Sequence, residues 1–104
     1  MANAVGMIEV YGLVAAFAAC DAGCKAANVT AEHFDKNKPG NADALPVPLI
    51  VCIKFRGSVS DVNAAVDAAA EAAAKVSGVV SKHVIANVEE STEKMLKLNA
   101  FDKN

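Results

Sequence analysis

The chain has 104 residues, of which 54% are hydrophobic and 5% aromatic, and a formal net charge of −2 at pH 7. Its lysines and its single arginine are scattered among acids and it has no tryptophan, so the composition argues against a nucleic-acid partner. No apolar stretch reaches the roughly 18 to 20 residues that a membrane-spanning helix needs, which argues against a membrane protein.

The first third of the chain predicts a strand, a helix and a second strand. Residues 4–11 alternate in polarity as a strand does, and Gly12 ends them. Residues 13–27 predict a helix, and residues 29–35 a strand of mixed polarity. One stripe of the helix, at i, i+4, i+7 and i+11, holds Leu13, Phe17, Cys20 and Cys24. We interpret this stripe as the core face of the helix.

The middle of the chain is irregular. Residues 35–49, DKNKPGNADALPVPL, contain all three prolines. The pair Pro39-Gly40 predicts a tight turn, and the later prolines delay strand pairing, because proline cannot donate to a sheet ladder. Residues 49–55, LIVCIKF, are almost continuously apolar, which favours a strand in the centre of a sheet.

The last part predicts a long helix, a strand and a short helix. Ser58 is the expected N-cap, with Asp61 completing a capping-box pattern, and Gly78 ends the helix. The predicted core stripe of this helix consists of Val59, Val62, Val66, Ala69, Ala73 and Val76. Residues 79–86 then predict a strand, and residues 91–98 an amphipathic helix anchored by Met95 and Leu98.

This order of elements, β-α-β-β-α-β plus a terminal helix, predicts an α+β fold. It is the split βαβ, or ferredoxin-like, arrangement: a four-stranded antiparallel sheet with two helices on one face. We expect residues 1–104 to form a single domain. The fold by itself does not predict a function, because this arrangement supports many different activities.

No group of residues predicts catalysis. Cys20 and Cys24 form half of a metal or iron–sulfur site, but a second cysteine pair is missing, so we interpret both as small core residues. Neither His33 nor His83 has a nucleophile or second histidine at a motif spacing, and both are interpreted as surface or interface residues. We expect no enzyme activity, no metal and no cofactor.

The location is expected to be cytosolic. The opening residues MANAVGMIEVYG lack the positive region of a signal peptide, and Glu9 interrupts their apolar run. The three cysteines match no disulfide framework, which is typical of a reducing compartment. With 22 alanines among the apolar residues, the chain buries little area per residue, which favours further burial in an oligomer.

Two long segments resemble a known family. Residues 6–30, GMIEVYGLVAAFAACDAGCKAANVT, resemble the opening of bacterial microcompartment shell proteins of the single-domain hexameric class. Residues 56–85 resemble the R-G helix of these proteins and the strand that ends in H-V-I. The resemblance implies a structural protein that forms cyclic homohexamers. These tile with other shell proteins into a facet around enzymes, and the encapsulated enzymes are further candidate partners.

The resemblance also implies residues at the outer edge of the hexamer. Lys25 matches a family lysine that packs adjacent hexamers, and Asn28 follows it closely. Many relatives carry a Pro-Arg pair after H-V-I, with the arginine at this edge. Here Ala86 and Asn87 take that place, so Asn87 is a candidate edge residue and tiling is expected to differ.

The irregular segment is the second departure from the family. Typical members join the second and third strands by a four-residue I-G-S-G loop that lines the central pore. Residues 37–49 stand in its place and are about nine residues longer. The candidate pore-loop residues are Lys36, Asn37, Lys38, Pro39, Gly40, Asn41, Ala42 and Asp43.

Several roles remain open for the long loop. It modifies the pore, closes it or binds a ligand there, or it is a surface insertion that packs over the disc. In relatives from shells with glycyl-radical enzymes, a loop cysteine holds an iron–sulfur cluster. This loop has neither cysteine nor histidine, so we expect no cluster. Two other functions stay open: a small-molecule-binding regulatory module, and an iron–sulfur or metal carrier that uses Cys20 and Cys24.

Overall fold

The computed structural model describes residues 3–97 of the chain. Its elements are β1 (Ala4–Tyr11), α1 (Leu13–Ala26), β2 (Thr30–Asn37), the 3₁₀ helix η1 (Ala42–Ala44), β3 (Ile50–Gly57), α2 (Val59–Val76), β4 (Val79–Ile85) and α3 (Glu90–Leu96). The predicted order of strands and α-helices is confirmed. More than half of the element ends differ from the prediction, by one or two residues, and η1 was not predicted.

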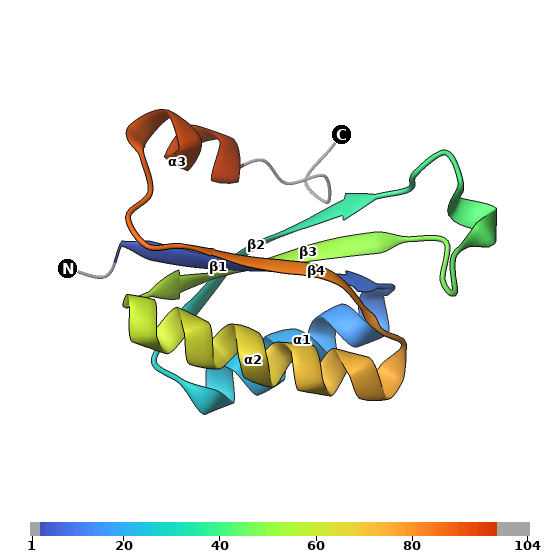
Figure 1. Cartoon of the computed structure of the whole chain (residues 1–104), viewed down its shortest axis with the longest axis horizontal. Helices are drawn as coiled ribbons and strands as arrows, with labels where there is room; N and C mark the ends of the chain where they lie inside the picture. Colours follow the sequence, from blue (N-terminus) through green and yellow to red (C-terminus); the bar gives the residue numbers. More distant parts are fainter. Residues whose placement is uncertain (1–2, 98–104) are drawn as a thin grey trace.

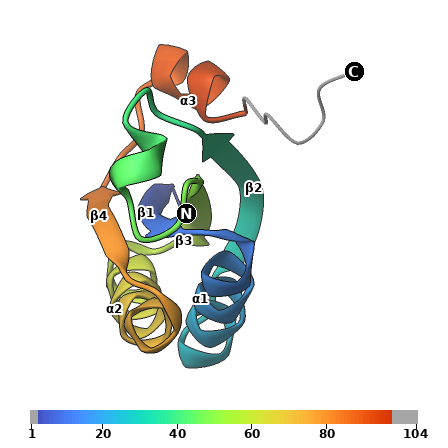
Figure 2. The ribbon, with the colours of Figure 1, turned by 90° about the vertical axis from the view of Figure 1, so that its right-hand side faces the viewer.

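The four strands form one antiparallel sheet in the order β2-β3-β1-β4. The predicted α+β class and the antiparallel four-stranded sheet are therefore confirmed. Helices α1 and α2 cover one face of the sheet, and α3 lies over the other (Figures 1 and 2). We call these the helix face and the α3 face.

Local signals set the ends of the two long helices. Gly12, with φ 87°, turns the chain from β1 into α1. The Ser58 hydroxyl accepts a hydrogen bond from the backbone N–H of Asp61 at 3.1 Å, so the predicted N-cap of α2 is confirmed. Gly78, with φ 151°, follows the last turn of α2, as predicted.

The helix face is packed mainly with small residues. Large side chains come from the strands, where Ile8, Ile53 and Phe55 are fully buried. The helices contribute alanines, together with Val62 and Val66. At Gly23 an added Cβ would lie 2.5 Å from the Phe55 ring, so this position must be glycine for α1 to lie so close to the sheet.

The predicted core stripe of α1 is wrong for three of its four residues, whereas Cys20 is half-buried and packs against the core. Leu13 and Phe17 are 40% and 63% exposed, and Cys24 is also exposed. The buried residues of α1 are Ala15, Ala16, Ala19 and Gly23. The space between α1 and its neighbours admits only alanine and glycine, which turns the larger side chains outward.

The other predicted core positions are partly correct. In α2 the central members of the stripe are buried, but Val59 and Val76, at its two ends, are 45% and 49% exposed. In α3 the buried residue is Leu96, whereas Met95 is 62% exposed and Leu98 lies outside the described residues. Leu96 packs with Val5 and Val88 on the α3 face.

Candidate functional site: the inter-strand loop and the polar rim

The loop between β2 and β3 is shorter than the sequence predicts. Lys36 and Asn37 belong to β2, where they pair with Val51 and Ile50 of β3. The connecting segment is therefore residues 38–49, which we call the loop. It projects from one end of the molecule, beyond the ends of the other two strands (Figure 1).

The tip of the loop is folded by its own hydrogen bonds. The N–H of Ala42 donates to the carbonyl of Pro39 at 3.0 Å, which confirms the turn predicted at Pro39-Gly40. Two further bonds, from Ala44 to Asn41 and from Leu45 to Ala42, form η1. Ala42 is only 4% exposed, so the loop packs on itself rather than extending freely.

The returning arm of the loop is fixed to the start of α1. The N–H of Gly12 donates to the carbonyl of Leu49 at 2.8 Å. The Val47 side chain lies against Gly12, 3.1 Å from the position a Cβ would occupy there. These contacts and the two exposed prolines, Pro46 and Pro48, hold the base of the loop to the body of the protein.

The exposed charges of this region surround the strand ends. Lys36, Lys38 and Asp43 are exposed, and a methyl group added at Gly40 would have no neighbour within 4 Å. A hollow of about 40 Å³ on the α3 face is lined by Glu9, Asp35, Lys36, Asn37, Ile50 and Cys52. The loop region thus offers polar groups of both signs: lysine outnumbers aspartate among the three exposed residues, and the hollow adds the carboxylates of Glu9 and Asp35.

The predicted edge residues lie near the ends of α1 and β4, at the opposite end of the molecule from the loop (Figure 1). Lys25 is fully exposed and binds Asp21 at 2.9 Å, and this hydrogen bond raises the pKa of Lys25. The backbone N–H of Asn28 donates to Asp61 at 3.4 Å, and the Asn87 amide oxygen accepts from Asn3 at 2.7 Å. We call Lys25, Asn28 and Asn87 the rim residues.

The thiols and histidines form no reactive group. Burial, with a smaller contribution from Cys24, raises the pKa of Cys20 to about 11, and burial likewise raises that of Cys52 to about 11. Both thiols are therefore protonated near pH 7, which disfavours metal binding and nucleophilic attack. Within residues 3–97, no group of three or more His, Cys, Asp or Glu side chains has a geometry suited to a metal ion.

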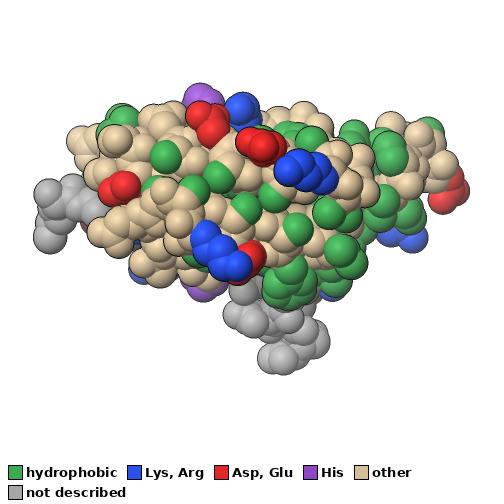
Figure 3. Space-filling model, turned by 90° about the horizontal axis from the view of Figure 1, so that it is seen from below, with side chains coloured by type: hydrophobic (Ala, Val, Ile, Leu, Met, Phe, Trp, Pro, Cys, Tyr) green, Lys and Arg blue, Asp and Glu red, His purple; other side chains and the backbone are tan. Residues whose placement is uncertain are grey.

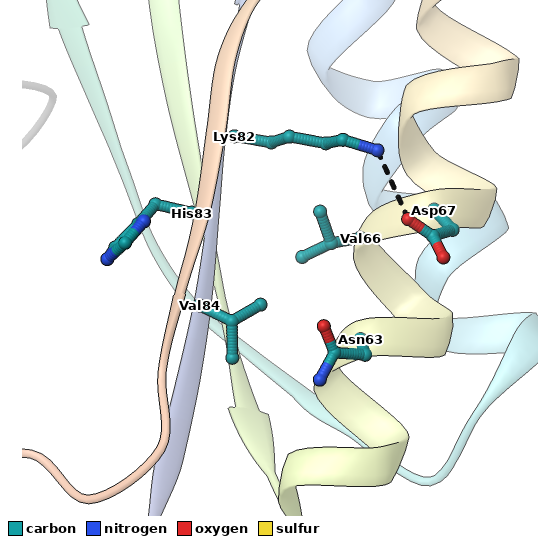
Figure 4. Close-up of a pocket in the computed structure, with 6 residues that line it drawn as sticks. All are labelled: Asn63, Val66, Asp67, Lys82, His83 and Val84. Atoms are coloured by element: carbon teal, nitrogen blue, oxygen red, sulfur yellow. Dashed lines mark hydrogen bonds and ion pairs between the residues drawn. The ribbon is translucent and has the colours of Figure 1, made fainter.

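A second hollow lies at the β4 edge, between β4 and α2. It has a volume of about 230 Å³ and is lined by Asn63, Val66, Asp67, Lys82, His83 and Val84. Lys82 and Asp67 form an ion pair of 3.1 Å across it, whereas the His83 ring points to the other side of the strand (Figure 4). We call it the α2–β4 hollow.

The sequence did not predict the charged residues beneath α3. The ammonium of Lys54, only 5% exposed, donates to the carbonyl of Leu96 at 3.0 Å. Arg56 binds Glu32 of β2 at 3.3 Å and Glu93 of α3 at 2.5 Å. The sequence did hold a signal for these contacts, namely Lys54 and Arg56 two residues apart in an otherwise apolar strand. Charged side chains that are buried need partners, so this pair could have predicted acidic or carbonyl groups above the strand.

Comparison with known proteins identifies the family of the chain. The family model of the BMC domain matches residues 4–88, from the first strand to the segment before α3. The chain belongs to the BMC-domain family. None of the helices described for this family member is long and apolar enough to cross a membrane.

The relatives are shell proteins. The bacterial microcompartment shell protein PduA of Citrobacter freundii is 40% identical over 94 residues, which cover 90% of this chain and 91% of PduA. The carboxysome shell protein CcmK1 of Thermosynechococcus vestitus is 40% identical over 98 residues, which cover 92% of this chain and 79% of CcmK1. The predicted role as a structural protein of a microcompartment shell is thereby confirmed.

A solved structure agrees with the fold. The crystal structure of a microcompartment protein from Desulfitobacterium hafniense superimposes with a TM-score of 0.64 at 25% sequence identity. The match covers 84% of this BMC-family chain but only 42% of that protein's chain.

Proposed function

We propose that this shell protein forms cyclic homohexamers that tile, with other shell proteins, into the facet of a microcompartment. In this proposal the whole chain acts as one BMC domain without a catalytic role. The loop surrounds the sixfold axis and narrows or closes the central pore. The rim residues face neighbouring hexamers.

The position of the two candidate regions carries the proposal. The protomer is elongated, with extents of 42 × 30 × 20 Å, and the loop and the rim residues lie toward its opposite ends (Figure 1). A protomer in a flat ring needs one end at the axis and the other at the periphery. Placing the loop at the axis therefore puts Lys25 where hexamers meet.

The charge of the loop region predicts which solutes the axis favours. Each residue near the axis would occur six times, so one side chain becomes a ring. Within residues 36–43, Lys36 and Lys38 supply two positive charges per protomer and Asp43 one negative charge, so this segment would form a cationic ring. Such a ring attracts anionic metabolites and repels cationic ones.

Electron microscopy of the purified protein tests the assembly. We expect hexagonal particles and sheets, with density of the loops at the sixfold axis. Dimers or trimers without sheets would instead support the regulatory-module alternative, for which the α2–β4 hollow is a candidate ligand site. The metal-carrier alternative, which uses Cys20 and Cys24, has less support, because burial raises the pKa of Cys20 to about 11 and the described residues hold no group of three or more ligands.

The Lys25→Ala variant tests the rim. The side chain is fully exposed and pairs with Asp21, one turn earlier in its own helix, so its removal should leave the protomer fold and the hexamer intact. Sheets should become smaller or disappear, because a long amine that reaches a neighbouring hexamer is lost. Sheets of unchanged extent in this variant would remove Lys25 from the edge contact.

A further inference from the structure

The exposed stripe of α1 is an unused apolar surface of the protomer. Leu13, Phe17, Cys20 and Cys24 follow one another along α1 at helical spacing, and we call them the α1 stripe. The centroid of the Phe17 ring lies 5.3 Å from that of Phe34, a half-buried residue of β2. Figure 3 shows hydrophobic side chains gathered over the start of α1.

Within the α1 stripe, Cys20 is half-buried against the core, whereas Leu13, Phe17 and Cys24 are exposed. The core face of α1 is made by its alanines and Gly23, which pack against the sheet and α2. Phe17 is 63% exposed in the protomer, even though its ring contacts that of Phe34. A large aromatic side chain, backed by a second ring, is typical of an anchor in a protein–protein contact.

The opposite edge of the protomer carries a complementary hollow. The sheet ends in β2 on one side and β4 on the other, with α1 beside β2 and α2 beside β4 (Figure 2). The α2–β4 hollow has Val66 and Val84 at its base (Figure 4). The Asp67–Lys82 pair that spans it has no net charge, so an apolar partner meets no uncompensated ion there.

The charged residues of the two edge strands are largely paired within the protomer. Glu32 of β2 binds Arg56 at 3.3 Å, and Lys82 of β4 binds Asp67 at 3.1 Å. An apolar contact between the two edges therefore leaves these ions with their partners, and exposed ion pairs of this kind contribute little to stability.

We propose that the α1 stripe of one copy packs into the α2–β4 hollow of the next copy, with Phe17 as the anchor. This inference rests on the ring proposed above, and it identifies the surfaces that close the ring. A protrusion on one edge and a hollow on the opposite edge make a head-to-tail contact, which is the kind that a cyclic assembly needs. Cys20 and Cys24 are then covered in the ring.

Glutamate at position 17 tests the anchor. Because Phe17 is mostly exposed in the protomer, Phe17→Glu should fold with an unchanged circular dichroism spectrum. In native mass spectrometry its ratio of rings to monomers should fall roughly tenfold or more relative to the unsubstituted protein. Ala64→Glu is the matched control, since Ala64 is an exposed helical residue that does not line the hollow, and its rings should persist.

The hollow is tested separately with Asn63→Trp, which fills it, and with Ala64→Trp as its control. Only Asn63→Trp should dissociate the ring. In the unsubstituted ring, Cys24 should react with N-ethylmaleimide at least several-fold more slowly than in the Asn63→Trp monomer, where the α1 stripe is intact but uncovered. This readout stands even if Phe17→Glu fails to fold.

The outcomes separate the inference from the proposal on which it rests. If the unsubstituted protein forms no rings, the proposed function fails and the inference fails with it. If it forms rings that both Phe17→Glu and Asn63→Trp leave intact, the inference alone is overturned. Rapid alkylation of Cys24 in intact rings would overturn it as well.

Discussion

The two faces of the sheet are covered in different ways. On the helix face, α1 and α2 approach closely through alanine and glycine, and the large side chains come from the strands. On the α3 face a single short helix is held by a small apolar cluster and by charged contacts from Lys54 and Arg56. Close packing dominates one face and polar attachment the other.

This difference separates global stability from local attachment. Removing atoms from the helix face leaves a cavity in the main core and weakens the whole fold. Removing a charge beneath α3 weakens the docking of one helix, which can open while the sheet stays intact. Substitutions on the two faces should therefore differ in size and in the part of the chain that responds.

The largest effect is expected from Phe55→Ala on the helix face. Phe55 is fully buried and contacts the region of Gly23, so its loss leaves a cavity beneath α1. We expect the free energy of unfolding to fall by about 3 to 5 kcal/mol, measured by urea denaturation. A loss below about 1 kcal/mol would mean that the helices collapse easily onto the sheet, and the contrast between the faces would then disappear.

A smaller effect is expected from Gly23→Ala. The new methyl group would lie 2.5 Å from the Phe55 ring and 3.1 Å from the Ala65 carbonyl, so α1 must move outward. Overpacking should outweigh the better helix propensity of alanine and leave a net loss of about 1 to 2 kcal/mol. Gly40→Ala is the control, because the loop has open space there, and a net gain in stability at position 23 would contradict the close-packing account.

The smallest effect on global stability is expected from Glu93→Gln beneath α3. The variant weakens the contact with Arg56, which keeps its bond to Glu32. We expect α3 amides to exchange faster by a factor that corresponds to about 1 kcal/mol, with little change in sheet amides. Glu90→Gln is the control, because Glu90 is exposed and lies in the same helical turn; it should leave amide exchange unchanged in α3 and in the sheet. Equal acceleration of α3 exchange in the two variants would argue against the Arg56 contact.

Much of the fold could be predicted because its signals are local. Ser58 and Gly78 mark the two ends of α2, and alternation marks β1 and β4 within one residue. The turn at Pro39-Gly40 is equally local, because proline and glycine restrict or free their own backbone dihedrals. The end of β2 was harder to predict from the sequence, because Lys36 and Asn37 belong to the strand through their pairing with β3.

The candidate site was less predictable. Lys25, Asn28 and Asn87 were identified through a family resemblance, and their position opposite the loop is visible only in the folded chain. Lys54 and Arg56 were overlooked, because their partners lie in α3 and β2, far along the sequence. The α2–β4 hollow likewise joins residues about twenty positions apart.

By itself, the sequence determined the order of the elements, the caps of α2, the turn in the loop and the resemblance to shell proteins. The tertiary structure alone decided which side of α1 is buried. Periodicity identifies an apolar stripe on a helix but not the space available to it. Here that space admits only alanine and glycine, so Phe17 and its neighbours face outward, toward the surface where we expect the next copy.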